Sequence, residues 1–181
     1  MTLVYSNKGP AVKSLQTRLN AAGRTRLRGL TEYADYGSLT MAQVVEFQFF
    51  SGFPTPQQDG QFGPLTDKKL AAHRKSSPPP TGRVIVVDLI NNRLRAFRNG
   101  TKDLDVKPIR GGSASDPSTR GVFKVVRALR HHTSSKFPIP PGNMDFSLFY
   151  NGGEALHQGP PDESSHGCIH VAPSEAERLF N

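Results

Sequence analysis

A run of three prolines divides this chain into two parts of different character. Residues 75–82 read Lys-Ser-Ser-Pro-Pro-Pro-Thr-Gly, and consecutive prolines favour extended polyproline II, a semi-rigid spacer without a core of its own. Helical patterns precede this segment and strand patterns follow it. The sequence therefore predicts two small domains, at residues 1–75 and 83–181, joined by a proline-rich linker at residues 76–82.

The composition is that of a basic protein with many turns. The 181 residues carry a formal net charge of +8, are 35% apolar and include 17 glycines and 15 prolines, which indicates little long helix. No apolar run approaches the roughly 20 residues that cross a bilayer, so we expect no membrane span.

The basic cluster of Arg24, Arg26 and Arg28 has no aromatic residues interleaved with it and no nucleic-acid motif beside it. We therefore expect no nucleic-acid partner. We interpret the cluster as a solvated face, with attraction to a polyanionic surface such as a bacterial wall as the alternative.

The N-terminal part carries helical patterns. Apolar residues recur at helical spacing from Val12 to Ala22, directly after Pro10, and Gly23 is placed to end that helix. A second helix is expected at residues 39–50.

Two similar tetrapeptides precede the second and third helices. Residues 37–40 read Gly-Ser-Leu-Thr and residues 63–66 read Gly-Pro-Leu-Thr. A threonine hydroxyl can accept a hydrogen bond from a free N–H at a helix N-terminus, and glycine permits the preceding turn. We expect Thr40 and Thr66 to cap their helices, the third of which completes a small three-helix bundle.

Short strands separated by turn signals fill the C-terminal part. Residues 83–89 and 93–98 have strand character, and Asn99-Gly100 suits a type I′ hairpin because both positions tolerate positive φ. Further strands are expected at residues 121–127, 146–150 and 154–157, and a capping box at residues 174–177 predicts a terminal helix. This spacing predicts a mostly β, sandwich-like domain, so the whole chain is expected to be α+β.

The only cysteine, Cys168, cannot form an internal disulfide. It lies in Ser-His-Gly-Cys-Ile-His at residues 165–170, eleven residues after His157. A base is needed to lower the thiol pKa, because the thiolate is the attacking form. Gly167 has no side chain, so a substrate carbonyl can approach backbone N–H groups that hold an oxyanion. This pattern favours nucleophilic catalysis.

Two alternatives for Cys168 remain open. Most free cysteines are small buried hydrophobic residues. A zinc site is the other alternative, because His166, Cys168 and His170 alternate and share one face of a strand, with His157 as a fourth donor. Ligands at alternate positions of one strand fit a tetrahedral cage poorly.

The C-terminal part resembles the L,D-transpeptidase catalytic domain of the YkuD type over about residues 83–180. The similarity is carried by residues 84–89, 111–112, 118–123, 155–159 and, most specifically, 165–171. It implies a YkuD-type fold and no metal or organic cofactor. The site residues that it implies are, for catalysis, Cys168, His157, His166 and Gly167, and, for substrate binding, Gln158, Gly159, Ser165 and His170.

The N-terminal part resembles the peptidoglycan-binding three-helix module that often accompanies wall enzymes. Residues 12–16, 45–48 and 59–66 carry the similarity, which covers about residues 8–72. The insert at residues 24–33 is longer than the usual turn of this module. The implied partners are peptidoglycan stem peptides and glycan.

These resemblances imply a cysteine-dependent enzyme of cell-wall remodelling. His157 would deprotonate Cys168, which would attack a stem tetrapeptide and form an acyl-enzyme. A stem amine, a free D-amino acid or water would then give 3→3 crosslinking, exchange or L,D-carboxypeptidase activity. Two alternatives are an antibacterial effector that uses this chemistry on a competitor's wall, with a cognate immunity protein, and a non-catalytic peptidoglycan-binding protein. Residues 1–8 show no Sec-type signal, so we expect export to the periplasm or wall by another route, such as a specialised secretion system.

Overall fold

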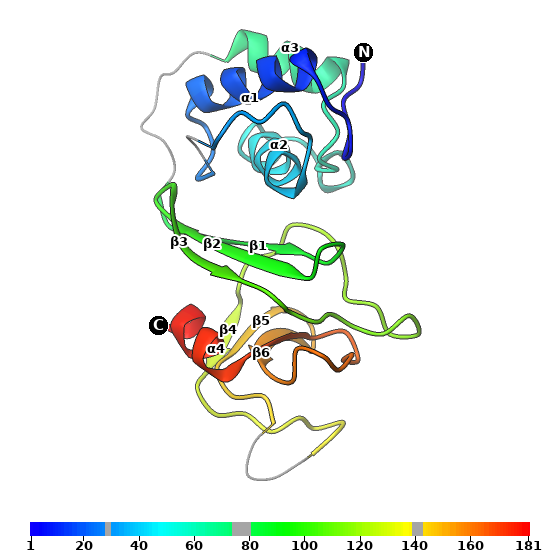
Figure 1. Cartoon of the computed structure of the whole chain (residues 1–181), viewed down its shortest axis with the longest axis vertical. Coiled ribbons are helices and arrows are strands. Elements are labelled where there is room, and N and C mark those ends of the chain that lie inside the picture. The colour runs from blue at the N-terminus through cyan, green and yellow to red at the C-terminus, as the bar shows by residue number, and fades with distance from the viewer. Residues whose placement is uncertain (28–29, 74–80, 139–142) are drawn as a thin grey trace. The chain divides into compact units, whose positions relative to one another are not determined.

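The computed structural model describes residues 1–27, 30–73, 81–138 and 143–181 (Figure 1). Most of the predicted linker, at residues 76–80, lies outside these ranges. The elements in chain order are α1 (Pro10–Ala22), α2 (Ser38–Phe50), the 3₁₀ turn η1 (Thr55–Gln57), α3 (Pro64–Ala72), β1 (Arg83–Asp88), β2 (Arg93–Arg98), β3 (Thr101–Val106), β4 (Arg127–Leu129), β5 (Ser147–Asn151), β6 (Glu154–Gln158), β7 (Ile169–Val171) and α4 (Pro173–Phe180). The predicted α+β class is confirmed.

The chain forms two compact units. One comprises Met1–Val86 with Ala96–Asp103, and the other comprises Val87–Arg95 with Leu104–Asn181. The domain limits drawn from the sequence at residues 75 and 83 remain a prediction. Within the described part of the chain, no helix has the length and apolar character needed to cross a membrane.

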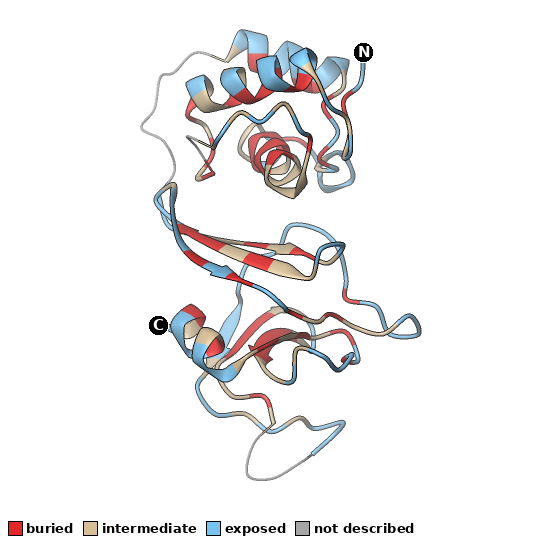
Figure 2. Cartoon of the chain, in the orientation of Figure 1, coloured by how far each residue is buried: buried red, intermediate tan, exposed pale blue. Residues whose placement is uncertain are grey.

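The three N-terminal helices form as the sequence predicts. Pro10 occupies the first turn of α1, where a missing N–H costs nothing, and Gly23 ends the helix in the left-handed conformation with φ 60°. The buried residues of α1 lie on the side that faces α2 (Figure 2). The shared core of this bundle consists of Leu3, Val12, Leu15, Leu19, Tyr36, Val44, Phe47, Phe62 and Leu70.

The prediction that Thr40 and Thr66 cap helices is wrong. Gly37 and Gly63 are the N-cap residues, and neither helix start has a side-chain cap. Both threonines are instead buried within the first turn, and the hydroxyl of Thr40 accepts a hydrogen bond from Gln16 on α1 at 2.9 Å. Burial between helices therefore decides the role of these hydroxyls.

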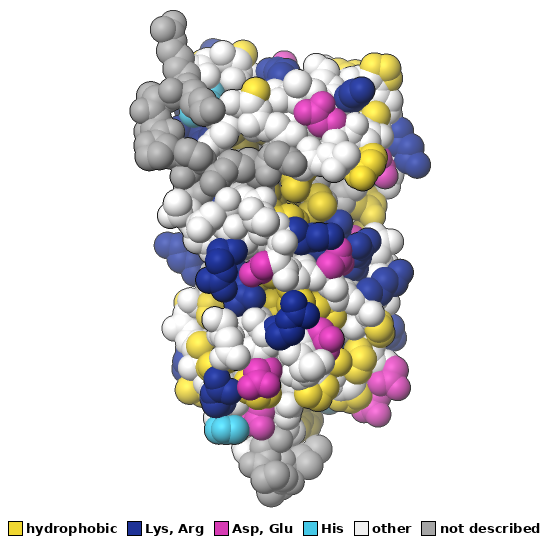
Figure 3. All heavy atoms as spheres, turned by 60° about the vertical axis from the view of Figure 1, so that its left-hand side comes forward, with side chains coloured by type: hydrophobic (Ala, Val, Ile, Leu, Met, Phe, Trp, Pro, Cys, Tyr) yellow, Lys and Arg dark blue, Asp and Glu magenta, His cyan; other side chains and the backbone are white. Residues whose placement is uncertain are grey.

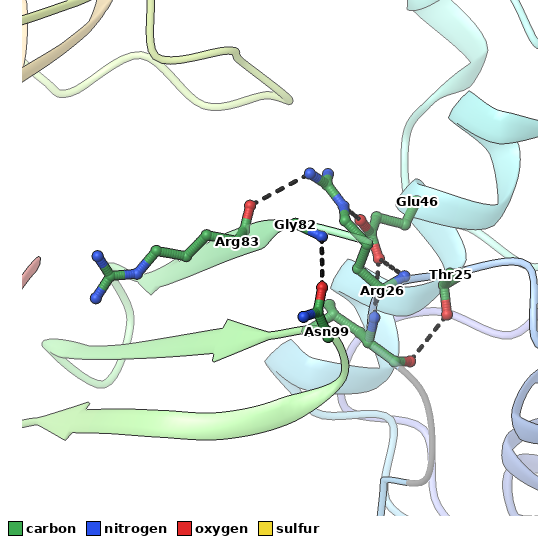
Figure 4. A network of polar contacts seen from close by, with 7 residues as sticks. Thr25, Arg26, Glu46, Gly82, Arg83 and Asn99 are labelled. Atoms are coloured by element: carbon green, nitrogen blue, oxygen red, sulfur yellow. Dashed lines mark hydrogen bonds and ion pairs between the residues drawn. The ribbon is translucent and has the colours of Figure 1, made fainter. Parts of the chain in front are cut away.

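The interpretation of the arginine cluster as a solvated face is also wrong where the structure describes it. Arg26 donates from Nε to Glu46 Oε1 at 2.6 Å and from Nη1 to the carbonyl of Arg83 at 3.2 Å (Figure 4). Arg24 donates from Nε to the carbonyl of Phe50 at 3.0 Å. Arg28 lies outside the described residues. On the face drawn in Figure 3, Lys and Arg side chains are interspersed with Asp and Glu and form no single basic patch.

The strands form two sheets, in the orders β1-β2-β3 and β4-β5-β6-β7. Asn99 and Gly100 connect β2 to β3 with φ values of 52° and 89°, which confirms the predicted type I′ geometry. In the second sheet β4, β5 and β6 pair antiparallel, whereas β6 and β7 pair parallel. Residues 159–168 form the loop that connects these two parallel strands and returns the chain to the same end of the sheet.

Two local predictions in the C-terminal part are wrong. The strand expected at residues 121–127 begins only at Arg127, and residues 121–126 are irregular and exposed. The terminal helix exists, but Ala172 is its N-cap without a side-chain cap, and Ser174 donates to Glu175 instead of closing a capping box. In both places the local sequence favours a strand or a helix cap, but the folded chain does not pair the groups that would form it.

Candidate active site

Adjacent parallel strands bring His157 and Cys168 to one face of the second sheet. The register of β6 and β7 pairs Leu156 with Ile169, His157 with His170 and Gln158 with Val171. Cys168 directly precedes β7 and packs against Ala155, which lies two positions before His157 on β6 and therefore on the same face of the sheet. The His157 ring centroid lies 5.1 Å from that of His170. His157 and Cys168 are therefore diagonal neighbours on one surface.

The His157 imidazole is buried and held in one tautomer. Only 4% of the residue is exposed, and Nδ1 donates to the carbonyl oxygen of Gln158 at 2.5 Å. This hydrogen bond leaves the lone pair on Nε2, as a proton acceptor requires. The group that orients this ring is thus a backbone carbonyl.

Burial lowers the pKa of His157 to about 4. The hydrogen bond to Gln158 opposes this shift, and the neighbouring rings of His170 and His132 add to it, because a second positive charge on this face is unfavourable. The imidazole is therefore neutral at pH 7 and available as a base.

The environment of Cys168 raises the pKa of its thiol. Burial is the main cause, the backbone of Ala155 acts in the opposite direction, and the carboxylate of Glu154 raises the pKa further. The side chain is half-buried against a cluster of Met144, Phe149 and Ala155. The expectation of a thiol pKa lowered in the resting site is therefore wrong.

The loop before Cys168 is held by a buried serine. Ser165 Oγ accepts the Gly167 N–H at 3.1 Å and donates to the Cys168 carbonyl. The Ser165 backbone also bonds the carbonyl of Gly111 and the N–H of Ser113. The Gly167 N–H therefore has an acceptor within the protein.

A second serine, Ser118, supports the same loop and was not assigned to the site from sequence. Its hydroxyl accepts the Gly112 N–H at 2.9 Å and donates to the Cys168 carbonyl at 3.3 Å. A Cβ on Gly112 would lie 2.0 Å from the carbonyl of Asp116 and 2.9 Å from the Gly167 nitrogen. Glycine at this position therefore permits the close approach of two loops.

His166 lies away from this buried pair. It is exposed, and its ring stacks on that of Phe137, with centroids 4.1 Å apart and planes inclined by 18°. Phe137 belongs to the loop at residues 131–143, of which residues 139–142 lie outside the described ranges.

His170 and Gly159 shape the loop between the two strands. His170 Nδ1 lies 3.2 Å from the Pro160 carbonyl and 3.1 Å from that of Glu163, so this nitrogen carries the proton. A Cβ on Gly159 would lie 2.7 Å from the His170 ring. Among the described residues, no group of three or more His, Cys, Asp or Glu side chains is placed to hold a metal ion.

Three further residues surround the cysteine loop and were given no role from the sequence. They are Glu154 and the two residues that donate hydrogen bonds to its carboxylate, Thr119 and Tyr150. The sequence signal that could have identified Glu154 is a carboxylate three positions before His157, at the start of an expected strand and followed by the apolar residues Ala155 and Leu156.

Two protein-family models match the chain. The YkuD model, described as an L,D-transpeptidase catalytic domain, matches residues 82–181. A putative peptidoglycan-binding domain matches residues 8–70. No protein of curated function matches the sequence.

Solved structures similar to this chain include several L,D-transpeptidases. One from Stackebrandtia nassauensis is 22% identical with a TM-score of 0.51, covering 98% of this chain and 88% of its own. One from Xylanimonas cellulosilytica is 27% identical with a TM-score of 0.47, covering 100% and 91%. One from Mycobacterium smegmatis is 19% identical with a TM-score of 0.48, covering 57% and 55%. The first of these shows a shared fold.

Proposed function

We propose, from the premise that this chain belongs to the YkuD family of L,D-transpeptidase catalytic domains, that it transfers peptidoglycan stem peptides through a thioester on Cys168. The observation that carries the proposal is the placement of a half-buried thiol and a neutral, oriented imidazole on one face of adjacent parallel strands. A nucleophile beside a base that a third group orients is the arrangement that acyl transfer requires.

The acylation step moves one proton twice. As sulfur bonds to the carbonyl carbon of the third-position diamino acid, His157 Nε2 takes the thiol proton and the carbonyl oxygen becomes an oxyanion. The tetrahedral intermediate then expels the amine of terminal D-alanine, which takes the proton from the imidazolium. The thioester remains. An acceptor amine or water resolves it by the reverse sequence and restores the thiol.

A neutral thiol and a neutral imidazole suit this order of events. A buried ion pair would have to be desolvated before substrate arrives, whereas proton transfer concerted with attack creates charge only when it is needed. The raised thiol pKa and the lowered imidazole pKa both favour the neutral pair. The base is thus fully in its acceptor form at pH 7.

The oxyanion is assigned to backbone donors around the cysteine. Because the Gly167 N–H already donates to Ser165 Oγ, we assign this role to the N–H groups of His166 and Cys168. A donor of this kind typically contributes a factor of about 10²–10³ to kcat.

The remaining residues expected from the sequence would act on substrate binding through the backbone that they hold. Ser165 fixes the cysteine loop, and His170 and Gly159 fix the loop between the strands. Gln158 supplies its carbonyl to His157 and its N–H to the carbonyl of Asp145. The N-terminal helices, which match a putative peptidoglycan-binding domain, would keep the enzyme on its polymer.

Product analysis tests the proposed reaction. Purified protein is incubated with disaccharide-tetrapeptide, with and without D-methionine, and products are identified by mass spectrometry. We expect release of D-alanine with one or more of crosslinked dimer, exchanged stem or tripeptide, and these products identify the acceptor. Intact tetrapeptide under all conditions, from protein that is folded by circular dichroism, would contradict the proposal.

The value of kcat/KM is expected to fall only at an unusually acidic pH. Because burial lowers the pKa of His157 to about 4, the base stays neutral down to that pH, and kcat/KM should be nearly constant from about pH 7 to 5. A limit near the ordinary histidine pKa of about 6.5 would show that another group, or an exposed imidazole, is the base.

Acid unfolding must be separated from loss of the base. His157 binds a proton more readily in the unfolded chain than in the folded one, so the free energy of unfolding should fall as pH drops from about 6.5 towards 4. Circular dichroism at each pH gives the folded fraction, to which the rates are normalised.

A further inference from the structure

A carboxylate at the start of β6 joins three segments that surround the nucleophile. Glu154 Oε2 accepts the Thr119 N–H at 2.9 Å and the Tyr150 hydroxyl at 3.0 Å. Glu154 Oε1 accepts the Thr119 hydroxyl at 2.5 Å and the side-chain N–H of Asn151 at 3.2 Å. Four donors from the turn after Ser118 and from β5 therefore converge on one side chain.

The same side chain lies against the peptide that precedes Cys168. A Cβ on Gly167 would lie 3.3 Å from Glu154 Cγ and 3.5 Å from Cδ, and Gly167 has φ +106°. The Tyr150 hydroxyl also lies 3.3 Å from the Gly167 carbonyl oxygen. Glu154 therefore limits the position of this peptide both by direct packing and through Tyr150.

The turn that contains Thr119 is also hydrogen-bonded to the backbone of Cys168, through the residue before Thr119. Ser118, the residue before Thr119, donates its hydroxyl to the Cys168 carbonyl at 3.3 Å. A shift of the turn would thus move the cysteine backbone, and the Thr119–Glu154 hydrogen bonds oppose such a shift. The carboxylate is the group common to both connections.

Glu154 is ionised at neutral pH. Burial by itself raises the pKa of Glu154, but the hydrogen bonds from Thr119, Tyr150 and Asn151 outweigh it and hold the pKa below its ordinary value. Burial and the charge of Glu154 together raise the pKa of the Tyr150 hydroxyl, so Tyr150 remains a donor. The charge is also felt at Cys168, where it adds to burial in raising the thiol pKa.

We propose that Glu154 is a positioning residue of the transfer reaction, which holds the Gly167–Cys168 peptide and the Thr119 turn in register and places its carboxylate where its charge acts on the Cys168 thiol. The inference rests on the proposed function for its effect on turnover. Its effect on the thiol is independent of any substrate. A purely structural carboxylate would support folding without changing the thiol.

The Glu154→Gln variant separates these roles. The amide keeps the shape of the side chain, but it has no charge and offers a donor where Glu154 offers an acceptor. We expect the apparent thiol pKa, measured from iodoacetamide alkylation against pH, to fall, so that alkylation at pH 7 becomes about 3-fold faster. The kcat on tetrapeptide should fall by roughly tenfold or more, because the loop loses its fixed geometry.

Two matched variants complete the experiment. Tyr150→Phe keeps the carboxylate but removes the link to the Gly167 carbonyl, so kcat should fall while the thiol pKa does not. Glu177→Gln removes an exposed carboxylate that pairs with Arg130 on the surface at 3.2 Å, and both measurements should equal those of the unmodified protein.

An unchanged alkylation profile in Glu154→Gln would overturn the proposal, even if kcat fell, because loosened packing alone explains a loss of turnover. A lower thiol pKa with unchanged kcat would overturn the positioning role. If the unmodified protein turned over no muropeptide, the proposed function would fail, and alkylation would still decide whether Glu154 controls the thiol.

Discussion

The Cys168→Ala variant is expected to form no crosslinked dimer, no exchanged stem and no tripeptide from disaccharide-tetrapeptide. The sulfur is the only group in the proposed mechanism that bonds to the substrate, and no other cysteine exists to replace it. Removal of a covalent nucleophile typically lowers kcat by about 10⁴-fold or more. The loss should therefore reach the detection limit of mass spectrometry.

The expected cost of this substitution in stability is small. Cys168 is half-buried at the edge of the cluster of Met144, Phe149 and Ala155, so removal of the sulfur should lower the free energy of unfolding by about 1 kcal/mol. Thermal unfolding of Cys168→Ala measures this cost. Lost activity with an intact unfolding transition assigns the defect to chemistry.

A β-lactam provides a second test of the same sulfur. A carbapenem ring is a strained acyl donor, so a reactive thiol should open it and increase the protein mass by one drug molecule. We expect this adduct in the unmodified protein and none in Cys168→Ala. Any stem-peptide product from Cys168→Ala, or an adduct on it, would place the nucleophile elsewhere and contradict the proposal.

The His157→Gln variant is expected to lose roughly 10²–10⁴-fold in kcat at pH 7, the usual contribution of a general base. Glutamine can still donate a hydrogen bond to the Gln158 carbonyl that the His157 ring now contacts. It has no nitrogen that accepts the thiol proton. Because the resting thiol pKa is raised, very little thiolate exists at pH 7 without a base.

The rate of His157→Gln should therefore rise with pH until the thiol ionises by itself, whereas the unmodified protein should show no such rise between about pH 5 and 7. Rates of acylation by a carbapenem, followed by mass, measure this profile without a second substrate.

His166→Ala is the matched control for the base. His166 is exposed and stacks on Phe137, so its removal should leave the pH profile of acylation unchanged. If His166→Ala lost more activity than His157→Gln, and if its rate rose with pH as the thiol ionised, His166 rather than His157 would be the base.

Local sequence signals predicted the elements whose conformation depends on their own residues. Gly23 ends α1 because only a residue that tolerates φ 60° fits there without strain. Asn99 and Gly100 form the β2–β3 turn for the same reason. The apolar spacing of α1 predicted its buried face correctly. The helical period and the apolar residues that form this face both lie within one short segment, so no distant residue is needed to predict it.

Predictions failed where a side chain had a choice of partners. Thr40 could cap α2 or bond to Gln16 of α1, and the second partner is chosen because both groups are buried and must be paired. Residues 121–126 have strand composition, but their side chains are exposed and no ladder forms over them. The thiol pKa was predicted to fall and is raised instead, because burial outweighs the backbone hydrogen bond from Ala155 and the charge of Glu154 adds to it.

The sequence by itself determined the α+β class and the family, and it singled out Cys168 as the candidate nucleophile, because each depends on residue type and short-range spacing. Only the tertiary structure decided the parallel register that puts His157 and Cys168 on one face, the neutral state of that pair, and the convergence of Thr119 and Tyr150 on Glu154. These features arise when segments far apart in the chain exclude water and meet, and the resulting burial and hydrogen bonds have no counterpart in any local pattern.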